Sequence, residues 1–359
     1  MAQPAIAVIG AGIIGCLIAR ELAARDPQAS ITVLDRDAIG AGASRRSAGM
    51  HLPRGATART RQMAAYSHAY YADLRRRHPE LPIHPIDATV ISGRAHGRAL
   101  GGGYLGLAAP APAGSMRDGA ICVPDGSLAW HIAGCHYTDV YQLAQAVAAR
   151  LRPRVRFLEG VAVTGLESSG GTVTVSGGTG KRLVADSVVL APGPWLSAPA
   201  WRDRIAPLGL RVKKVVALHI EQRPGPADEA VVFDDEDAFL LPLRHRGHWL
   251  FSYTCQEWDV DPDGLAAGLS AADIGAARDC LRRYSPALAD ACGAGRVFCD
   301  AYSPDREPLV RALDETGRIV FAGAANGSGY RLAPAIGAEA ADLLQFQQSE
   351  GVSGDHQHV

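Results

Sequence analysis

The stretch that decides the fold is residues 4–36, which read PAIAVIGAGIIGCLIARELAARDPQASITVLDR. Residues 5–9 are a short apolar run rich in β-branched side chains, which is typical of a buried parallel strand. Residues 16–24 mix apolar and polar side chains as a helix does, and residues 31–34 predict a second strand. A strand, a helix and a second strand in this order predict a βαβ unit.

Three glycines join the first strand to the helix in the spacing G-x-G-x-x-G, and they are Gly10, Gly12 and Gly15. The first allows a tight turn, the second lets backbone amides approach a pyrophosphate, and the third lets the helix pack closely on the strand. The N-terminus of the helix adds unpaired N–H groups and the positive end of a dipole. Asp35 ends the second strand, where a carboxylate can accept both hydroxyls of a ribose. The unit therefore predicts dinucleotide binding, but it does not distinguish FAD from NAD.

The composition is that of an ordinary globular protein. The chain has 359 residues, of which 47% are hydrophobic and 20% charged, and its net charge is −1. That length allows two domains, and the charge balance argues against a nucleic-acid partner. The most apolar stretch, residues 6–19, is too short for a transmembrane segment, and no secretory signal precedes the first strand, so we expect a cytoplasmic protein. Seven cysteines without a C-x-x-C and histidines without ligand spacing predict reduced thiols and no metal.

Further along the chain, helical and strand patterns alternate. Helices are expected at residues 57–77, 136–151 (with Thr138 or Asp139 as N-cap), 271–284 and 332–346. Strands are expected at residues 155–157, 161–163, 172–176, 183–190, 215–220, 230–233, 239–243, 249–253 and 319–321. Residues 81–130 are punctuated by proline and glycine, with a loose tract at 101–114, and indicate a small α+β insertion.

A second glycine-rich loop, GAANGSG at residues 323–329, opens into the last predicted helix. Such a loop concentrates amide donors and positive potential at the helix N-terminus. A reduced flavin carries negative charge on its N1–C2=O edge, whereas nicotinamide gains no such charge. The loop can stabilise that anion, and it therefore favours FAD over NAD.

We therefore expect an α/β fold in which a discontinuous, Rossmann-like FAD-binding domain is joined to an α+β substrate domain built on an antiparallel sheet. Residues 1–76, 138–210 and 316–348 are assigned to the FAD-binding domain. Residues 77–137 and 211–315 are assigned to the substrate domain, and residues 349–359 to a flexible tail.

Five segments of the sequence together resemble the D-amino-acid oxidase superfamily of FAD-dependent oxidoreductases. They are VIGAGIIG (8–15), SRRSAGM (44–50), VVLAPGPW (188–195), YSPDREPLV (302–310) and GSGYRLAPAIG (327–337). The resemblance covers nearly the whole chain and is strongest to the glycine oxidase, sarcosine oxidase and D-amino-acid dehydrogenase branch. It implies a bound FAD and the oxidation of an amine carbon by hydride transfer to flavin N5, which gives an imine.

The resemblance also implies which residues meet FAD. The pyrophosphate turn would be Gly10, Gly12, Ile13, Ile14 and Gly15, and the ribose end Asp35 and Arg36. The loop along the diphosphate and flavin would be Ser44, Ala48, Gly49 and Met50, and the adenine contact Val163. The flavin edge would be Gly327, Ser328, Gly329, Tyr330, Arg331 and Leu332. We add Gly193, because ligands of open α/β sheets lie where strands end.

The sequence departs from the family pattern at two positions. Sarcosine oxidases attach the flavin to a cysteine a little before a P-D or L-D step, and Cys299 is displaced from that place by one residue. A shift of one residue turns a strand side chain to the opposite face, so we expect a non-covalent FAD. Glycine oxidase-like members carry an arginine five residues before Asp305 to clamp the substrate carboxylate, and here that position is Asp300.

Arg331 matches a lysine that helps to hold the carboxylate in sarcosine oxidases, and we expect it to serve as the clamp. Asp300 would then give the pocket a negative wall, which favours a substrate with a second positive group or one whose carboxylate turns towards Arg331. Alternatively, Asp300 points away and pairs with Arg306 or Arg311. His51 is the best candidate for a polar group near the flavin, and no catalytic base stands out.

Three functions stay open at this point. The first is oxidation of the C–N bond of an amino acid or small amine. The second is FAD-dependent dehydrogenation of a 2-hydroxy acid, and the third is a flavin-holding subunit of a larger oxidoreductase. The sequence does not decide the substrate or its stereochemistry, the electron acceptor (oxygen or a quinone) or the oligomeric state.

Overall fold

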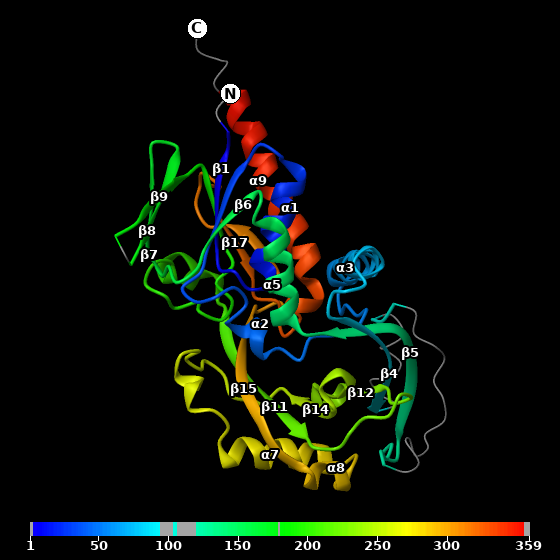
Figure 1. Ribbon diagram of the computed structural model, residues 1–359. Coiled ribbons are helices and arrows are strands. Elements are labelled where there is room, and N and C mark those ends of the chain that lie inside the picture. The colour runs from blue at the N-terminus through cyan, green and yellow to red at the C-terminus, as the bar shows by residue number, and fades with distance from the viewer. Residues whose placement is uncertain (1–2, 94–102, 106–119, 179, 355–359) are drawn as a thin grey trace.

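The computed structural model describes residues 3–93, 103–105, 120–178 and 180–354. Two large sheets dominate it, one in the upper and one in the lower half of Figure 1. The chain passes between the two halves several times, so each sheet is built from segments far apart in the sequence. This is the mixed α/β fold expected from the sequence.

The upper sheet has six strands in the order β16-β17-β10-β1-β2-β6. All neighbours run parallel except β16 and β17. In chain order the strands are β1 (Ala5–Ile9), β2 (Ser30–Leu34), β6 (Val155–Leu158), β10 (Ser187–Leu190), β16 (Leu309–Ala312) and β17 (Ile319–Gly323). The expected Rossmann-like arrangement is therefore present, with β1 at the centre.

Both faces of this sheet are covered. One face is covered by the helices α1 (Ile13–Arg25), α5 (Val140–Leu151) and α9 (Gly329–Gly354), and α3 (Ala58–Arg77) packs against α9 (Figure 1). The other face packs against α6 (Arg202–Ile205) and a three-stranded sheet of β7 (Val163–Ser169), β8 (Thr172–Gly177) and β9 (Arg182–Ala185). Because both faces are covered, every position of the strand from Ile6 to Ile9 is buried, as in other parallel sheets.

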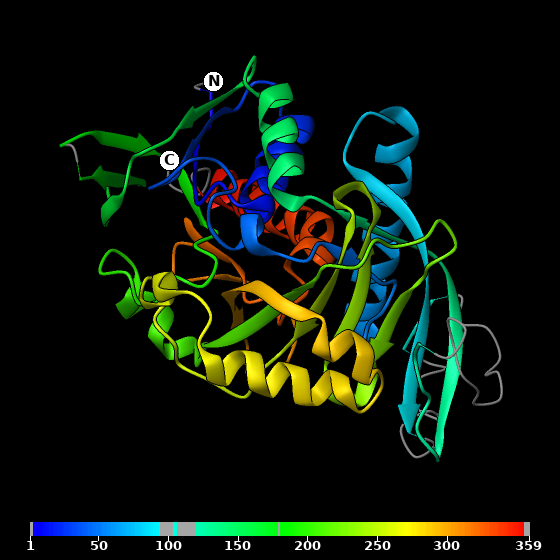
Figure 2. The same cartoon turned by 60° about the horizontal axis from the view of Figure 1, so that its bottom comes forward.

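The lower sheet has eight strands in the order β15-β11-β14-β13-β12-β4-β5-β3, antiparallel except for β12 with β4. They are β3 (Met50–His51), β4 (Ile83–Gly93), β5 (Ser127–Thr138), β11 (Arg211–Ile220), β12 (Ala230–Phe233), β13 (Ala238–Leu243), β14 (His248–Tyr253) and β15 (Cys292–Tyr302). The helices α7 (Ala271–Arg282) and α8 (Pro286–Asp290) cover one face (Figure 2). The short elements are α2 (Ala43–Arg46), η1 (Ala206–Leu208), η2 (Asp234–Glu236), η3 (Arg244–Arg246) and η4 (Gly264–Ala267).

The helix expected at residues 136–151 begins later than the sequence suggested. Residues up to Thr138 belong to β5, which pairs with β3 and β4, and the helix starts at Val140. Asp139 is its N-cap, because the carboxylate of Asp139 accepts a hydrogen bond from the backbone N–H of Gln142 at 3.0 Å. Pairing with two strands thus outweighs the local helical pattern, and Thr138 is not the cap.

Other boundaries differ by smaller amounts. Helix α1 begins at Ile13, directly after the glycine turn, and the strand expected at 183–190 is divided between two sheets at Asp186. Strand β16 lies within 211–315 but pairs in the upper sheet. Helix α9 runs to Gly354, into the expected tail, and residues 355–359 lie outside the described residues. So does most of the tract at 101–114, and the described part of the 81–130 insertion contains strands but no helix.

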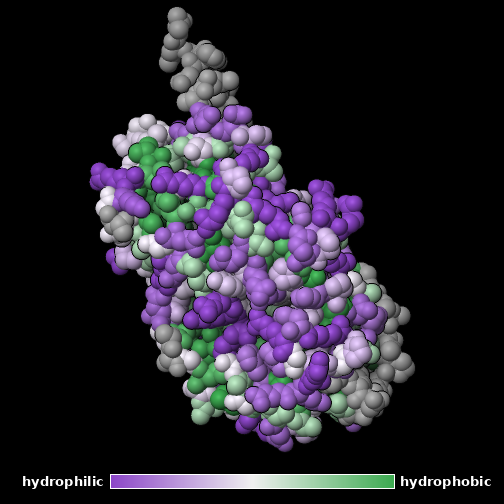
Figure 3. Space-filling view, in the orientation of Figure 1, coloured by the Kyte–Doolittle hydropathy of each residue, from purple (hydrophilic) through white to green (hydrophobic). Residues whose placement is uncertain are grey.

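The outer surface is predominantly polar. In the view of Figure 3, hydrophilic residues cover most of the face, with small hydrophobic areas between them. The large hydrophobic side chains that are exposed on the described part of the molecule are Tyr66 and Val184, which lie singly. None of the described helices has the length and apolar character needed to cross a membrane.

We predict that Gly15→Ala destabilises the fold, because a Cβ at Gly15 would lie 1.8 Å from the carbonyl oxygen of Gly10. Relieving that overlap requires α1 to move away from β1, at a cost of about 1–3 kcal/mol in the free energy of unfolding. Chemical denaturation measures the change. Gly275→Ala in α7 is the matched control, since no atom lies within 4 Å of the new Cβ and helix propensity should add about 0.5–1 kcal/mol of stability. Equal changes in the two variants would contradict this account.

Candidate functional site

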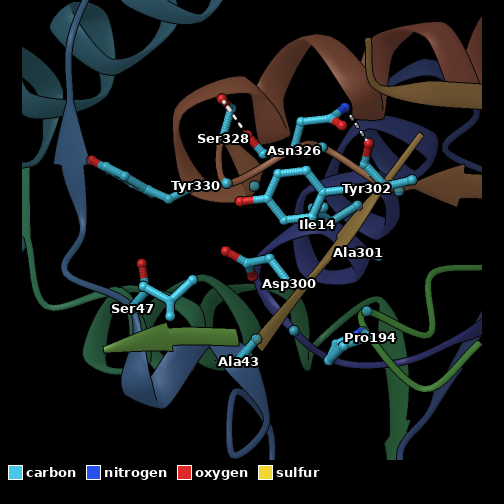
Figure 4. A pocket seen from close by; sticks show the side chains of 18 of the residues that line it. Ile14, Ala43, Ser47, Pro194, Asp300, Ala301, Tyr302, Asn326, Ser328 and Tyr330 are labelled. Carbon is cyan, nitrogen blue, oxygen red and sulfur yellow. Dashed lines mark hydrogen bonds between the residues drawn. The ribbon is translucent and has the colours of Figure 1, made fainter. Parts of the chain in front are cut away.

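A cavity of about 1020 Å³ is lined by residues of both large sheets (Figure 4). Its walls include the ends of β1, β2 and β10, the N-termini of α1 and α9, and one face of the lower sheet. This volume is at the upper end of the range for small-molecule sites, roughly 300–1,000 Å³. The cavity therefore has room for a large cofactor.

The glycine turn between β1 and the N-terminus of α1 forms part of the cavity wall. Gly10 has a φ of +104°, and a Cβ there would lie 2.2 Å from the carbonyl oxygen of Ala191, so only glycine fits. A Cβ at Gly12 would approach only the Oγ of Ser44, at 3.3 Å, and would otherwise fill open cavity. The Oγ of Ser44 accepts the N–H of Ile13 at 3.0 Å. Bare backbone next to free helix N–H groups is the environment that a diphosphate requires.

One end of the cavity carries the acidic residue of the motif. The carboxylate of Asp35 accepts the N–H of Ala11 at 2.7 Å and that of Asp37 at 2.9 Å. Burial raises the pKa of Asp35 above its ordinary value. Each carboxylate oxygen keeps a lone pair for a ribose hydroxyl, and Val163, at the start of β7, lines the same cavity.

The second glycine loop closes the opposite side. Ala324, Asn326 and Gly327 all have positive φ, which turns the chain sharply from β17 into α9. The side chain of Asn326 holds this turn, because its Oδ1 accepts the N–H of Ser303 at 3.0 Å and its Nδ2 donates to the carbonyl of Ala324 at 2.8 Å. The loop is therefore fixed to the end of β15, with the N-terminus of α9 facing the cavity.

The residues that line the cavity fit FAD. A ribose acceptor, a bare glycine turn and a second helix N-terminus follow one another along its length, as a dinucleotide requires. No cysteine of the described chain lines it. Cys299 belongs to a hydrophobic core cluster that also contains Val212 and Ala301, and burial raises the pKa of its thiol to about 12. A buried, protonated thiol does not react as a nucleophile.

Arg331 projects from the first turn of α9 and lines the cavity. Its Nε is buried and has no hydrogen-bond partner among the described residues, while one terminal nitrogen donates to the Oγ of Ser328. Burial lowers the pKa of the guanidinium to about 10, with Arg54 as a second, repulsive cause. An under-satisfied cation at a cavity wall is suited to an anionic ligand.

Asp300 lies on β15 and points into the same cavity (Figure 4). Its carboxylate has no hydrogen bond or ion pair with any described side chain, so the alternative pairing with Arg306 or Arg311 is absent. Burial raises the pKa of Asp300 to about 6. Another carboxylate of the cavity, that of Asp234, is paired with Arg54 at 2.5 Å.

The structure brings most of the sequence-predicted residues to one cavity. Of the cofactor and substrate candidates, only Gly15 and His51 are absent from its lining. Gly15 serves the packing of α1 on β1. His51, expected as a polar group near the flavin, does not line the cavity: it follows Met50 on β3, and because strand side chains alternate, it is buried on the other side of the strand.

His51 instead belongs to a buried aromatic cluster. Its ring stacks on His136 at 4.4 Å between centroids, and its Nε2 lies 3.3 Å from the Nδ1 of His68. Tyr330 accepts or donates a 2.9 Å hydrogen bond with His136. Burial lowers the pKa of both His51 and His136, so these rings are neutral at physiological pH.

Sequence reasoning missed three groups beside Asp300. Lys213 is opposite Asp300 in the β11–β15 register, and its ammonium lies 4.8 Å from the ring centroid of Trp258. Tyr302, two residues after Asp300, also lines the cavity. The alternating positions 298, 300 and 302 could have signalled this wall, but Lys213 and Trp258 come from separate segments and carry no local motif.

The sequence matches the family described as FAD dependent oxidoreductase (DAO) over residues 5–343. The chain belongs to this family. It is therefore an FAD-dependent oxidoreductase, and the choice of FAD over NAD is confirmed. A curated relative from Bacillus subtilis (strain 168), described as the uncharacterized oxidoreductase YurR, is 26% identical over 372 residues, covering 96% of this chain and 95% of that protein.

Solved structures of the family share the fold at low sequence identity. Glycine oxidase from Geobacillus kaustophilus superposes with a TM-score of 0.74 and 19% identity, covering 95% of this chain and 94% of that one. L-proline dehydrogenase from P. horikoshii has a TM-score of 0.78 and 16% identity over 95% and 93% of the two chains. Fructosyl amine:oxygen oxidoreductase from Aspergillus fumigatus has a TM-score of 0.78 and 19% identity over 96% and 86%.

We predict that acid precipitation of the purified yellow protein releases FAD into the supernatant. The reason is that Cys299, the nearest cysteine to the family's attachment point, is buried on the opposite face of β15. The measurement is the absorption spectrum of supernatant and pellet, with Cys299→Ala as the control. Yellow colour that stays in the wild-type pellet but not in that of the variant would show a covalent bond to Cys299.

Proposed function

We propose that this oxidoreductase oxidises the C–N bond of an amino acid or small amine to an imine, with non-covalent FAD as its cofactor. The observation that carries the proposal is the guanidinium of Arg331, which lines the cofactor cavity and whose buried Nε has no hydrogen-bond partner among the described residues. A carboxylate is the group that such a fork binds best. The names of the structural neighbours, which describe oxidation of amino acids or amines, support the same class of reaction.

The residues of this chain contribute mainly by position. When bound, FAD supplies the acceptor for the hydride that leaves the amine carbon. Arg331 would hold the substrate carboxylate by charge-assisted hydrogen bonds and so fix the orientation of the amine carbon. The apolar wall formed by Ala48, Val215 and Phe298 limits water around the reacting centre and strengthens these interactions.

The proposal is tested by an anaerobic screen in which amines, amino acids and their 2-hydroxy analogues are mixed with the holoenzyme. Bleaching of the flavin absorbance by an amine, but not by its hydroxy analogue, is the expected result. Bleaching by the hydroxy acid alone would replace the proposal with 2-hydroxy-acid dehydrogenation. If no compound bleaches the flavin, the chain is better described as a flavin-holding subunit.

We predict that Arg331→Ala weakens binding of the best amino-acid substrate by about ten- to a hundredfold, because a charge-assisted pair in a dry site contributes roughly 1.5–3 kcal/mol. Steady-state kinetics and the dissociation constant from anaerobic flavin reduction measure the effect. Arg331→Lys should retain part of the affinity. Arg211→Ala is the matched control, since Arg211 also lines the cavity but is already paired with Asp259 at 2.6 Å. An equal loss in both alanine variants would assign no special role to Arg331.

A further inference from the structure

We propose that Asp300 binds the ammonium group of the substrate and takes the proton that this group must lose before oxidation. This inference rests on the proposed oxidation of an amine and assigns the proton acceptor that the reaction needs. Amines are largely protonated at neutral pH, yet hydride can leave the carbon only when nitrogen has a free electron pair. A cavity that oxidises amines therefore benefits from a built-in base.

The proton balance is simple. An N–H bond of the ammonium breaks, the proton moves to a carboxylate oxygen of Asp300, and the electron pair stays on nitrogen. That pair forms the C=N bond as hydride leaves the carbon, with FAD as the two-electron acceptor. The organic product is an iminium ion, and Asp300 later returns its proton to solvent.

Elimination favours Asp300 over the other titratable groups. No histidine or cysteine of the described chain lines the cavity. The lining carboxylates are Asp35, Asp37, Asp234, Asp237 and Asp300. Asp35 and Asp37 lie at the ribose end, Asp234 is paired with Arg54, and Asp237 is exposed. Asp300 is thus the partly buried carboxylate inside the cavity that has no hydrogen bond or ion pair with a described side chain (Figure 4).

Lys213 lies next to Asp300 on the neighbouring strand but does not pair with it. Antiparallel register places Lys213 directly opposite Asp300, where an ion pair would be the obvious arrangement. Lys213 is only 6% exposed, but its ammonium turns to the rings of Trp258 and Tyr302, at 4.8 and 5.8 Å from their centroids. The fold therefore keeps a cation beside Asp300 without neutralising it, and the carboxylate stays available to a cation from outside.

The charge on Asp300 depends on pH because burial raises its pKa to about 6. The cationic side chains that also line the cavity are Arg36, Arg54, Arg211, Lys213, Arg306 and Arg331. Burial raises the pKa of Tyr302 far above its ordinary value. A change in ligand binding near pH 6 that disappears when Asp300 is substituted therefore reports the titration of Asp300.

The first test uses ligands that cannot be oxidised, so it does not depend on turnover. tert-Butylammonium has no hydrogen on the carbon next to nitrogen, and trifluoroacetate is an anion that stays ionised at about pH 5. Binding of each to the holoenzyme is measured by calorimetry. The ammonium ion should bind about tenfold more weakly at about pH 5 than at about pH 8, because most of Asp300 is then protonated. Trifluoroacetate should not weaken in that direction.

Two variants make this test decisive. Asp300→Asn should bind tert-butylammonium weakly at every pH, whereas Asp237→Asn, a change at an exposed lining carboxylate, should keep the wild-type pH dependence. Asparagine also tolerates the positive φ of 49° at residue 237. If the pH dependence survives in Asp300→Asn, or if trifluoroacetate follows the same trend as the ammonium ion, the assignment is wrong.

Asp300→Asn is expected to fold. A carboxyl whose pKa is raised in the folded state weakens the fold as the pH rises through about 6, and asparagine removes that penalty. The variant should therefore melt at a higher temperature than wild type at about pH 8 and at a similar temperature at about pH 4. A lower melting temperature at both pH values would show that Asp300 is structural and would overturn the proposal.

A kinetic test separates this inference from the proposed function. With the best amine from the screen, Asp300→Asn should slow flavin reduction about tenfold or more at neutral pH. The difference in rate from wild type should shrink as the pH approaches the pKa of the amine in solution, because the substrate then arrives without the extra proton. A deficit independent of pH would exclude proton transfer to Asp300. If no amine reduces the flavin while the ammonium probe still shows its pH dependence, the cation site stands and amine oxidation fails.

Discussion

The contact between Gly15 and the carbonyl oxygen of Gly10 is the constraint on which the rest of the structure depends. With no side chain at Gly15, α1 lies directly on β1, and its N-terminal N–H groups point to the end of the central strand. Helix α9 then packs on α1 through another glycine, because a Cβ at Gly337 would lie 3.2 Å from the backbone of Leu17. Two close packings in series thus bring two helix N-termini to one cavity, although they are separated by most of the chain.

The features of the fold and of the cavity that could be predicted from the sequence are those defined by a short, continuous stretch of residues. The glycine turn, the carboxylate at Asp35 and the loop before α9 are each defined within a few residues, and the sequence placed them on the cavity wall. The start of α5 was predicted wrongly because the residues before Asp139 form a strand, β5, that pairs with strands from distant segments. That His51 does not line the cavity was not predictable, because the direction of side chains on a two-residue strand cannot be inferred from its sequence. The isolation of Asp300 depends on where Lys213 turns, which only the three-dimensional structure shows.

The cavity combines charges of different kinds. Arg54 and Asp234 neutralise each other at 2.5 Å, which shows that the fold can pair charges here when both partners come from its own chain. Arg331 and Asp300 are not paired in this way, and burial shifts the pKa of each towards its neutral form. Both shifts mean that the protein loses stability by keeping these groups charged. Such a loss is expected where a ligand of opposite charge completes the interaction.

Histidine, the usual base near neutral pH, has a different place in this protein. His51 on β3 and His136 on β5 are stacked in the protein interior, where burial lowers the pKa of both rings and holds them neutral. They are linked to the cavity wall through Tyr330 of α9, whose hydroxyl is hydrogen-bonded to His136. Burial moves a histidine away from neutral pH but moves an aspartate towards it. The same low-polarity interior therefore keeps His51 and His136 neutral and makes a carboxylate such as Asp300 the suitable base.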